Sequence, residues 1–285
     1  MISISLAAAA DPIRWIPPVL EHRYDRSLTG HLVFLGTGTS LGVPAVGCGC
    51  PVCKSAHPRN QRSRCGVVLG LPEGYLLIDT PTDLRTQLLR ERIGLIDAIA
   101  FTHSHADHVF GLDDVRPFSL YLGHPLPVYC EAEVEDRIRQ SFDYAFSPEP
   151  ATHQGATPQL EFIRIGTEPF EVLGARITPI RLRHGRFQVL GFRVGNVAYC
   201  TDTNGIPEES LARLTGLDVL ILGALRHRPH PTHFSLSEAI DVAEQIRAKR
   251  TLFTHISHDL EHQATNAELP AGMELAYDGM QIELT

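Results

Sequence analysis

Short apolar runs that end in polar residues recur along the chain. Each run is rich in β-branched or aromatic residues and has glycine or proline nearby, a pattern typical of strands. The runs occupy residues 31–35, 75–78, 96–101, 177–182, 197–200 and 252–254. Gly, Asp, Thr or His follows five of the runs directly, and the run 177–182 ends near His184, so side chains able to bind ligands collect at predicted strand ends.

Three segments with a helical spacing of apolar residues lie between these runs. Their apolar positions are Leu84, Leu88 and Leu89; Val134, Ile138, Phe142 and Phe146; and Ala239, Ile240, Ala243 and Ile246. We expect the first helix to stop at Gly94. Ser235 and Glu238 have the spacing of a capping box, so the third helix should begin there. Residues 147–159 are rich in Pro, Thr and Gly and predict a loop.

Strands and helices therefore alternate, which predicts one α/β domain over residues 31–285. Residues 1–30 are expected to form an N-terminal extension. The chain length of 285 residues suffices for a sizeable core. We find no internal repeat and no low-complexity linker that would divide it.

Composition and charge narrow the classes of function. The chain has 25 Lys and Arg against 33 Asp and Glu, a net charge of −8, which argues against a nucleic-acid partner. No apolar run is long enough to cross a bilayer, and the N-terminal apolar stretch lacks the preceding positive charge of a secretory signal. Three of the six cysteines lie within six residues, which suits a metal better than disulfides. We expect a cytoplasmic protein with reduced thiols.

The densest chemical signal is a cluster of histidine and aspartate. His103, His105, Asp107 and His108 lie within six residues, directly after a predicted strand. Imidazole and carboxylate groups suit Zn, Mn or Fe, and a turn after a strand can direct neighbouring side chains at two metals. A polar surface turn is the alternative, but further His and Asp residues at other strand ends favour a metal site.

A second cluster predicts a separate metal site. Cys48, Cys50 and Cys53 lie on a glycine-rich loop, where three thiols can converge on one tetrahedral zinc ion. The fourth ligand is either Cys65 or a histidine from elsewhere in the chain. The glycines are not followed by a Gly-Lys-Ser/Thr ending, so a nucleotide-binding loop is disfavoured.

The pattern H-x-H-x-D-H after a strand resembles the metallo-β-lactamase superfamily, whose fold is a four-layer αββα sandwich. The resemblance implies two divalent metal ions in the active site, Mn or Zn or Fe. Their ligands would be His103, His105 and His184 for one metal, Asp107, His108 and His255 for the other, and Asp202 as the bridge. With a bridging hydroxide, the reacting centre would keep about one net positive charge and attract an anionic substrate.

Three segments narrow the resemblance to the PhnP family, phosphoribosyl 1,2-cyclic phosphate phosphodiesterases. They are residues 34–40 together with the C-x-C-x-x-C pattern that follows them, residues 111–118, and residues 254–258. The resemblance covers about residues 31–285. It implies that His258, rather than Cys65, completes the structural zinc site. It also implies that His233, in an H-F-S context, assists catalysis by protonating the leaving oxygen or by holding a phosphoryl oxygen. The alternative is that His233 merely orders the helix start.

Two further groups are assigned from their chemistry. Asp79 is expected to orient a ligand histidine rather than to bind metal. The residues Arg226, His227, Arg228 and His230 either bind phosphate or are simply solvated.

The sequence thus predicts a dinuclear metal-dependent phosphodiesterase, a phosphoric diester hydrolase. Metal-bound hydroxide would attack a small phosphate diester, cyclic diesters included, with His233 and Asp107 as catalytic residues. One alternative is an RNA-processing endonuclease of the same superfamily, which the acidic balance disfavours. The other is a non-catalytic metal-binding protein similar to PqqB. A homodimer is compatible with the resemblance.

Overall fold

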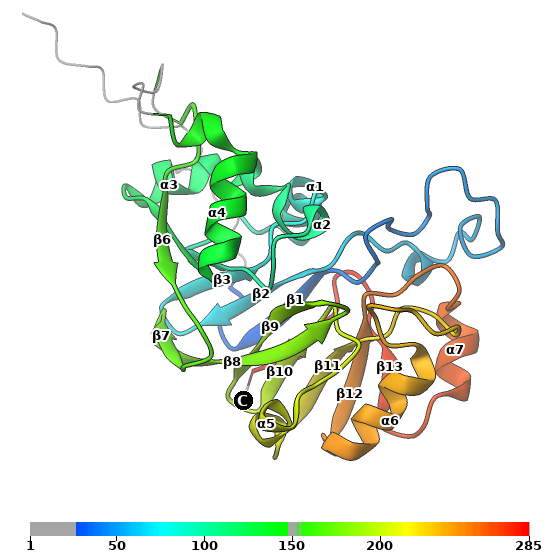
Figure 1. Ribbon diagram of the computed structural model, residues 1–285. Coiled ribbons are helices and arrows are strands. Elements are labelled where there is room, and N and C mark those ends of the chain that lie inside the picture. Colours follow the sequence, from blue (N-terminus) through cyan, green and yellow to red (C-terminus); the bar gives the residue numbers. More distant parts are fainter. Residues whose placement is uncertain (1–26, 148–152, 154, 285) are drawn as a thin grey trace, which may run out of the picture.

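A computed structural model describes residues 27–147, 153 and 155–284. Two seven-stranded sheets pack face to face, with helices on both outer sides (Figure 1). The first sheet has the order β14 (Gln281–Glu283), β1 (His31–Gly36), β2 (Gly66–Leu71), β3 (Gly74–Ile78), β4 (Ala98–Ala100), β5 (Leu126–Cys130), β6 (Leu160–Arg164). The second has the order β13 (Met273–Leu275), β12 (Arg250–Thr254), β11 (Val219–Gly223), β10 (Val197–Cys200), β9 (Phe187–Val194), β8 (Ala175–His184), β7 (Phe170–Val172).

Helices cover the outer face of each sheet. Four follow strands of the first sheet: α1 (Leu84–Glu91), α2 (Ala106–Val109), α3 (Arg116–Leu122) and α4 (Ala132–Ser141). Three belong to the second: α5 (Glu208–Leu211), α6 (Leu236–Ile246) and α7 (His262–Glu268). Short 3₁₀ turns are η2 (Pro58–Asn60), η3 (Leu112–Val115), η4 (Asp143–Ala145) and η5 (Ala212–Leu214). Among the described residues, no helix is long and apolar enough to span a membrane.

The alternation of side chains along the strands produces the layers. In β1, Leu32 and Phe34 belong to the core between the two sheets, whereas Val33 and Leu35 belong to the core under α1–α4. A third core joins the second sheet to α6. Because strands are buried on both faces, they read as continuous apolar runs rather than as alternating ones. The predicted four-layer α/β sandwich is confirmed.

Both sheets are mixed, and this topology decides where the functional residues gather. Strands β3 to β6 run parallel, as do β10 to β13, while the remaining neighbours are antiparallel. Parallel strands end at the same edge of a sheet, so residues that follow β10 and β12 lie near one another. Each of the six predicted apolar runs forms or overlaps a strand.

Two predicted helix boundaries were wrong. The first helix ends at Glu91 rather than near Gly94, because Arg92 adopts a left-handed conformation (φ 54°) and its N–H closes on the carbonyls of Leu88 and Leu89. The stripe to Phe146 is not one helix: α4 ends at Ser141, and the chain continues into the turn η4. The capping box at Ser235 and Glu238 is confirmed as the start of α6.

Two other predictions, the N-terminal extension and the loop at residues 147–159, fall partly outside the described residues. Most of the expected N-terminal extension, residues 1–26, lies outside them, as do 148–152 and 154 of the expected loop. Just after residue 26, Leu28 is buried and its N–H donates to the hydroxyl of Tyr75 (3.1 Å). Residues 155–159 form neither helix nor strand.

Candidate metal centre

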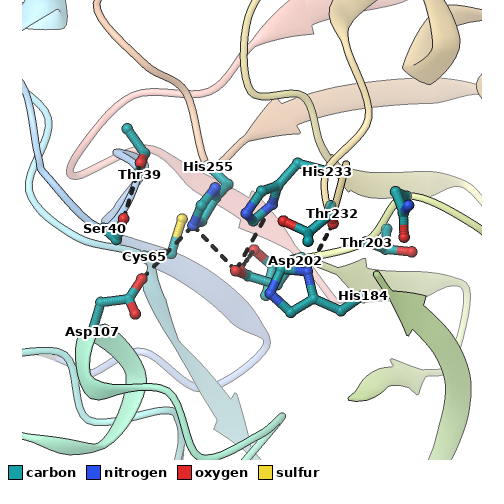
Figure 2. A network of polar contacts seen from close by, with 12 residues as sticks. Thr39, Ser40, Cys65, Asp107, His184, Asp202, Thr203, Thr232, His233 and His255 are labelled. Carbon is teal, nitrogen blue, oxygen red and sulfur yellow. Dashed lines mark hydrogen bonds and ion pairs between the residues drawn. The ribbon is translucent and has the colours of Figure 1, made fainter. Parts of the chain in front are cut away.

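The polar residues predicted at strand ends converge at one edge of the two sheets (Figure 2). His184 ends β8, Asp202 follows β10, and His255 follows β12. Asp202 and His255 have left-handed backbones (φ 49° and 56°), as does Asp79 after β3 (φ 63°). Non-glycine residues in this region carry strain of about 1–3 kcal/mol and cluster at functional sites. The strain therefore marks these strand ends as places where side-chain direction matters.

The start of α2 lies inside the histidine–aspartate cluster, so the residues before and after it point in different directions. His105 is the N-cap residue of α2 and keeps an extended backbone (ψ 153°), whereas Asp107 and His108 lie inside the helix. A turn followed by one helical turn therefore lets neighbouring residues face two different positions. The rings of His103 and His105 lie in edge contact, with centroids 4.5 Å apart.

The structure brings all seven predicted ligands together in two groups. In each group the candidate ligand atoms lie within 4.8 Å of one another: His103, His105 and His184 in the first, and Asp107, His108, Asp202 and His255 in the second. Asp202 also groups with His184, so it lies between the two sets. Its Oδ2 is 3.2 Å from His108 Nε2, and its Oδ1 is 3.3 Å from His255 Nε2.

The hydrogen bonds of three histidines leave their Nε2 lone pairs for another partner. His184 donates its Nδ1–H to the carbonyl of Thr232 (2.7 Å), and His108 donates its Nδ1–H to Asp79 (2.7 Å). The hydroxyl of Thr102 donates to Asp79 (2.8 Å) and therefore accepts from His103 Nδ1 (2.9 Å). This arrangement, with Nδ1–H bound to oxygen, is typical of metal-ligating imidazoles. Asp79 contacts His108, one of the candidate ligands, on the side of the ring that bears Nδ1.

Buried atoms without partners provide a test of whether metal fits. The Nε2 atoms of His103, His108 and His255 are buried and make no hydrogen bond among the described residues, although those of His108 and His255 face the carboxylate oxygens of Asp202 at 3.2 and 3.3 Å. Leaving such an atom unsatisfied costs about 1–3 kcal/mol. A set of imidazoles and carboxylates is also the donor set that Zn, Mn and Fe accept. The residues present therefore fit a pair of divalent cations.

The charges in this site are strongly coupled. Burial alone would lower the pKa of His108, but the carboxylates of Asp202, Asp79 and Asp107 raise it well above its usual range. Burial would raise the pKa of Asp202, yet His255 and His108 hold it well below its ordinary value. Burial lowers the pKa of His103 far below normal. The carboxylate of Asp202 is thus ionised, which favours cations beside it.

His233 lies beside this centre without belonging to either main group. Its ring stacks on His255 (centroids 4.7 Å apart, 14° between planes), and its Nδ1 is 4.0 Å from Asp202 Oδ1 (Figure 2). Burial, with His255 nearby, lowers the pKa of His233 to about 3. The start of α6 is already capped by Ser235 and Glu238, so the helix does not need His233.

The three clustered cysteines meet a histidine from the other end of the chain. His258 Nδ1 lies 3.2 Å from the sulfurs of Cys48 and Cys53 and 3.7 Å from that of Cys50. In a tetrahedral zinc site, with bonds of about 2.3 Å to sulfur and 2.0 Å to nitrogen, each sulfur lies about 3.5 Å from the nitrogen. The distances from His258 Nδ1 to the three sulfurs therefore fit zinc. Cys65 lies elsewhere, buried against Thr254 (3.4 Å), and burial raises its pKa to about 12. The structure places His258, and not Cys65, with the three thiols.

Sequence reasoning missed the residues that support the ligands. Thr102 precedes His103 directly, so a search for hydrogen-bonding neighbours could have found it. Thr232 contributes only its carbonyl, which leaves no signal in the sequence. Arg62 is almost fully buried and donates to the carbonyls of Ser257 (2.9 Å) and Leu260 (2.8 Å), which flank the segment of His258.

Comparisons with known proteins agree with the fold and the site. Residues 75–256, which include all seven residues of the candidate metal centre, match the model described as "Beta-lactamase superfamily domain". A crystal structure described as a new diphosphatase from the PhnP family has a TM-score of 0.83 and 44% identity, and the alignment covers 90% of this chain and 98% of that one. The chain therefore belongs to the β-lactamase superfamily and, within it, to the PhnP family.

Two curated relatives extend the picture. An octanoyltransferase of Porphyromonas gingivalis is 36% identical over 253 residues; the match covers 87% of this chain but 50% of that protein. The chain thus spans about half the length of this relative, whose name describes a longer protein. Coenzyme PQQ synthesis protein B of Methylorubrum extorquens is 25% identical over 315 residues, with coverage of 89% and 100%. The family and the clustered ligands support a metal-dependent hydrolase.

Proposed function

We propose that the protein is a metal-dependent phosphodiesterase that hydrolyses a small phosphate diester, cyclic diesters included. The observation that carries the proposal is the pair of candidate ligand groups, with Asp202 of the second group within 4.8 Å of His184 of the first, and a cationic pocket beside them. His103, His105 and His184 would hold one cation, Asp107, His108 and His255 the second, and Asp202 would bridge them. When bound, the two cations would lower the pKa of a water molecule and draw negative charge from the phosphate.

The pocket next to His233 supports an anionic substrate. This cavity of about 270 Å³ is lined by Arg226, Arg228 and His230 as well as by His233, and by one carboxylate, that of Asp259, which lies 3.9 Å from Arg228. The backbone N–H of Thr232 donates to His230 Nδ1 (3.3 Å), so the neutral ring carries its proton on Nε2, where it can donate a hydrogen bond. These groups supply local positive charge and donors in a chain whose net charge is −8.

His233 would act on the substrate, although its ring nitrogen also lies within 4.8 Å of the candidate ligand atoms of His184 and Asp202. It lies between the ligand cluster and the cationic pocket, in contact with His255 and His184. From there the N–H of the neutral imidazole could hold a phosphoryl oxygen. To give a proton to the leaving oxygen as the P–O bond breaks, His233 would first have to be protonated, which the negative charge of a bound phosphate favours. Asp107 would contribute as a ligand and as part of the negative charge that binds the second cation.

One observation favours a second candidate function. The 44% identical structure is described as a diphosphatase, so the scissile bond could be the P–O–P link of a diphosphate rather than the P–O–C link of a diester. Both reactions place water on phosphorus and require a stabilised leaving oxygen. The two reactions differ in the leaving group, so an assay with one substrate of each kind distinguishes them.

The test is hydrolysis by the purified protein loaded with Mn²⁺ or Zn²⁺. We expect turnover of bis(p-nitrophenyl) phosphate and of 2′,3′-cyclic nucleotides, and little or none of nitrocefin or thioesters. A diphosphate diester such as ADP-ribose tests the second candidate. Cleavage of ADP-ribose alone would replace the diesterase proposal by the diphosphatase one. Cleavage of a tRNA precursor alone would favour RNA processing. No turnover of any substrate with metals bound would favour a non-catalytic role like that expected for a PqqB-like protein.

A matched pair of variants tests the role of His233. His233→Gln should lower kcat by about 10²-fold or more at unchanged metal content. His227→Gln changes an exposed histidine of the same loop that does not line the cavity, and it should retain full activity. Equal activity of the two variants would contradict the assigned role.

A further inference from the structure

A second pocket of different character, which shares no lining residue with the cationic pocket, also borders the candidate metal centre. This cavity of about 390 Å³ is lined by His103 and His105 of the first ligand group, by Phe110, Phe187 and Val134, and by the charged side chains of Glu131, Glu133 and Arg137. We call it the aromatic pocket. Phe110 and Phe187 are 51% and 48% exposed, which is high for such large apolar side chains. Single exposed apolar residues need no explanation, but two phenyl rings in one cavity beside a metal centre do.

The backbone ties both rings to the candidate metal ligands. Phe110 is the C-cap residue of α2, the helix that carries Asp107 and His108. Phe187 begins β9 and is the cross-strand partner of His184, across the tight turn of residues 185–186. Their positions relative to the metal centre are therefore set by a helical turn and a hairpin rather than by a mobile loop.

Side-chain contacts fix the orientation of the two rings. Phe187 packs edge to face with His105 (centroids 5.7 Å apart, 88° between planes), and the guanidinium of Arg186 lies 4.9 Å from its centroid. Phe110 packs in the same manner on Phe142 (5.9 Å, 88°), which is itself buried in the core. Both rings are held along part of their surface and leave the rest facing the cavity. A rigid aromatic surface loses little conformational entropy when a flat group stacks on it.

We propose that the aromatic pocket binds a flat, apolar ring of the substrate, attached on one side of the scissile phosphate. This inference rests on the proposed phosphodiesterase function and adds a substrate class to it: diesters with an aromatic or heteroaromatic substituent. The two pockets would then orient the substrate. Its ring lies on Phe187 and Phe110, its phosphate lies at the metal centre, and any further anionic group faces Arg228 and His230.

A pair of substrates that differ only in the ring tests the inference. Adenosine 2′,3′-cyclic phosphate and methyl β-riboside 2′,3′-cyclic phosphate share the sugar and the scissile bond, but only the first carries a planar base. Stacking of one base is expected to tighten binding about tenfold. The wild-type protein should therefore show a KM about tenfold lower for the adenosine compound, with similar kcat values.

Variants connect that difference to the pocket. Phe187→Ala should reduce the KM ratio to about twofold or less, and Phe187→Leu should retain part of it. Leu89→Ala, an exposed apolar residue of α1 that does not line the cavity, should leave the ratio unchanged. Thermal denaturation of each variant establishes that it is folded. A wild-type ratio near one, or a ratio that survives Phe187→Ala, would overturn the inference.

Calorimetric binding of the same two compounds separates this inference from the proposed function. If neither compound is hydrolysed but the adenosine compound binds about tenfold more tightly and loses that advantage in Phe187→Ala, the pocket assignment stands and the phosphodiesterase proposal fails. If both are hydrolysed with equal KM and equal affinity, the phosphodiesterase proposal stands and the pocket assignment fails.

Discussion

Replacing Asp79 by asparagine removes a buried charge from behind the candidate metal centre while keeping the size of the side chain. Asparagine also tolerates the left-handed backbone at this position (φ 63°). The carboxylate accepts from the N–H and hydroxyl of Thr102 (both 2.8 Å) and from His108 Nδ1 (2.7 Å). An amide presents one oxygen and one NH₂ group, so at least one of these donors must then face another donor.

The size of the effect follows from these contacts. Loss of a hydrogen bond to a charged group costs about 1.5–3 kcal/mol. Removal of a carboxylate that orients a ligand histidine lowers metal affinity by about 10–100-fold, which corresponds to about 1.4–2.7 kcal/mol. Because Asp79 bonds His108 directly, we expect the cation held by Asp107, His108 and His255 to be weakened most.

Zinc and manganese titrations, by calorimetry or by competition with a chromogenic chelator, measure this affinity. Asp278→Asn is the matched control: the side chain of Asp278 is 10% exposed, accepts from the N–H and hydroxyl groups of Thr37 and Ser63 (2.6–2.9 Å) and pairs with Arg90 (3.2 Å), but contacts no candidate ligand. It should lower stability without lowering metal affinity. Unchanged affinity in Asp79→Asn, or an equal loss in Asp278→Asn, would refute the reasoning.

Three further predictions concern the rest of the fold. Cys48→Ser should remove about one tightly held zinc per chain, measured by metal analysis after mild chelation; an unchanged zinc content would exclude the thiol site. Arg62→Met leaves the carbonyls of Ser257 and Leu260 unsatisfied and should lower the free energy of unfolding by about 2–4 kcal/mol in denaturant titrations; a loss below about 1 kcal/mol would show that water replaces the guanidinium. Burial, with Arg62 nearby, lowers the pKa of His262 to about 4 in the folded chain. As the pH falls below about 6.5, this histidine is therefore protonated in the unfolded chain before it is protonated in the folded one. Stability should be full above about pH 6.5 and fall by up to about 3 kcal/mol towards pH 4; His262→Gln should flatten that slope, and an identical slope in the variant would contradict it.

The sequence indicates the local part of this site far better than its assembly. The spacing of His103 to His108 and the placement of Asp202 and His255 after apolar runs are visible because a strand end directs the next residue toward the sheet edge. Which runs become neighbours is a non-local matter: β1 pairs with β14, about 250 residues away along the chain. Pairing of that kind leaves no mark in either segment alone.

Other features escaped prediction for local reasons. The end of α1 depends on the left-handed backbone of Arg92, a conformation that nothing in the residue type announces. The partner of His184 is a carbonyl, and every residue has one. The aromatic pocket arises from Phe110, at the end of α2, and Phe187, at the start of β9, which line one cavity only after folding. The residue type alone can indicate a metal ligand, but it does not indicate which side chains will line a cavity.

The most direct measurement is anomalous diffraction from crystals grown with Zn²⁺ or Mn²⁺. The account predicts two neighbouring anomalous peaks that flank Asp202, one in contact with His103, His105 and His184 and the other with Asp107, His108 and His255. A map with no peak at these seven side chains, from protein that is folded and saturated with metal, would contradict it.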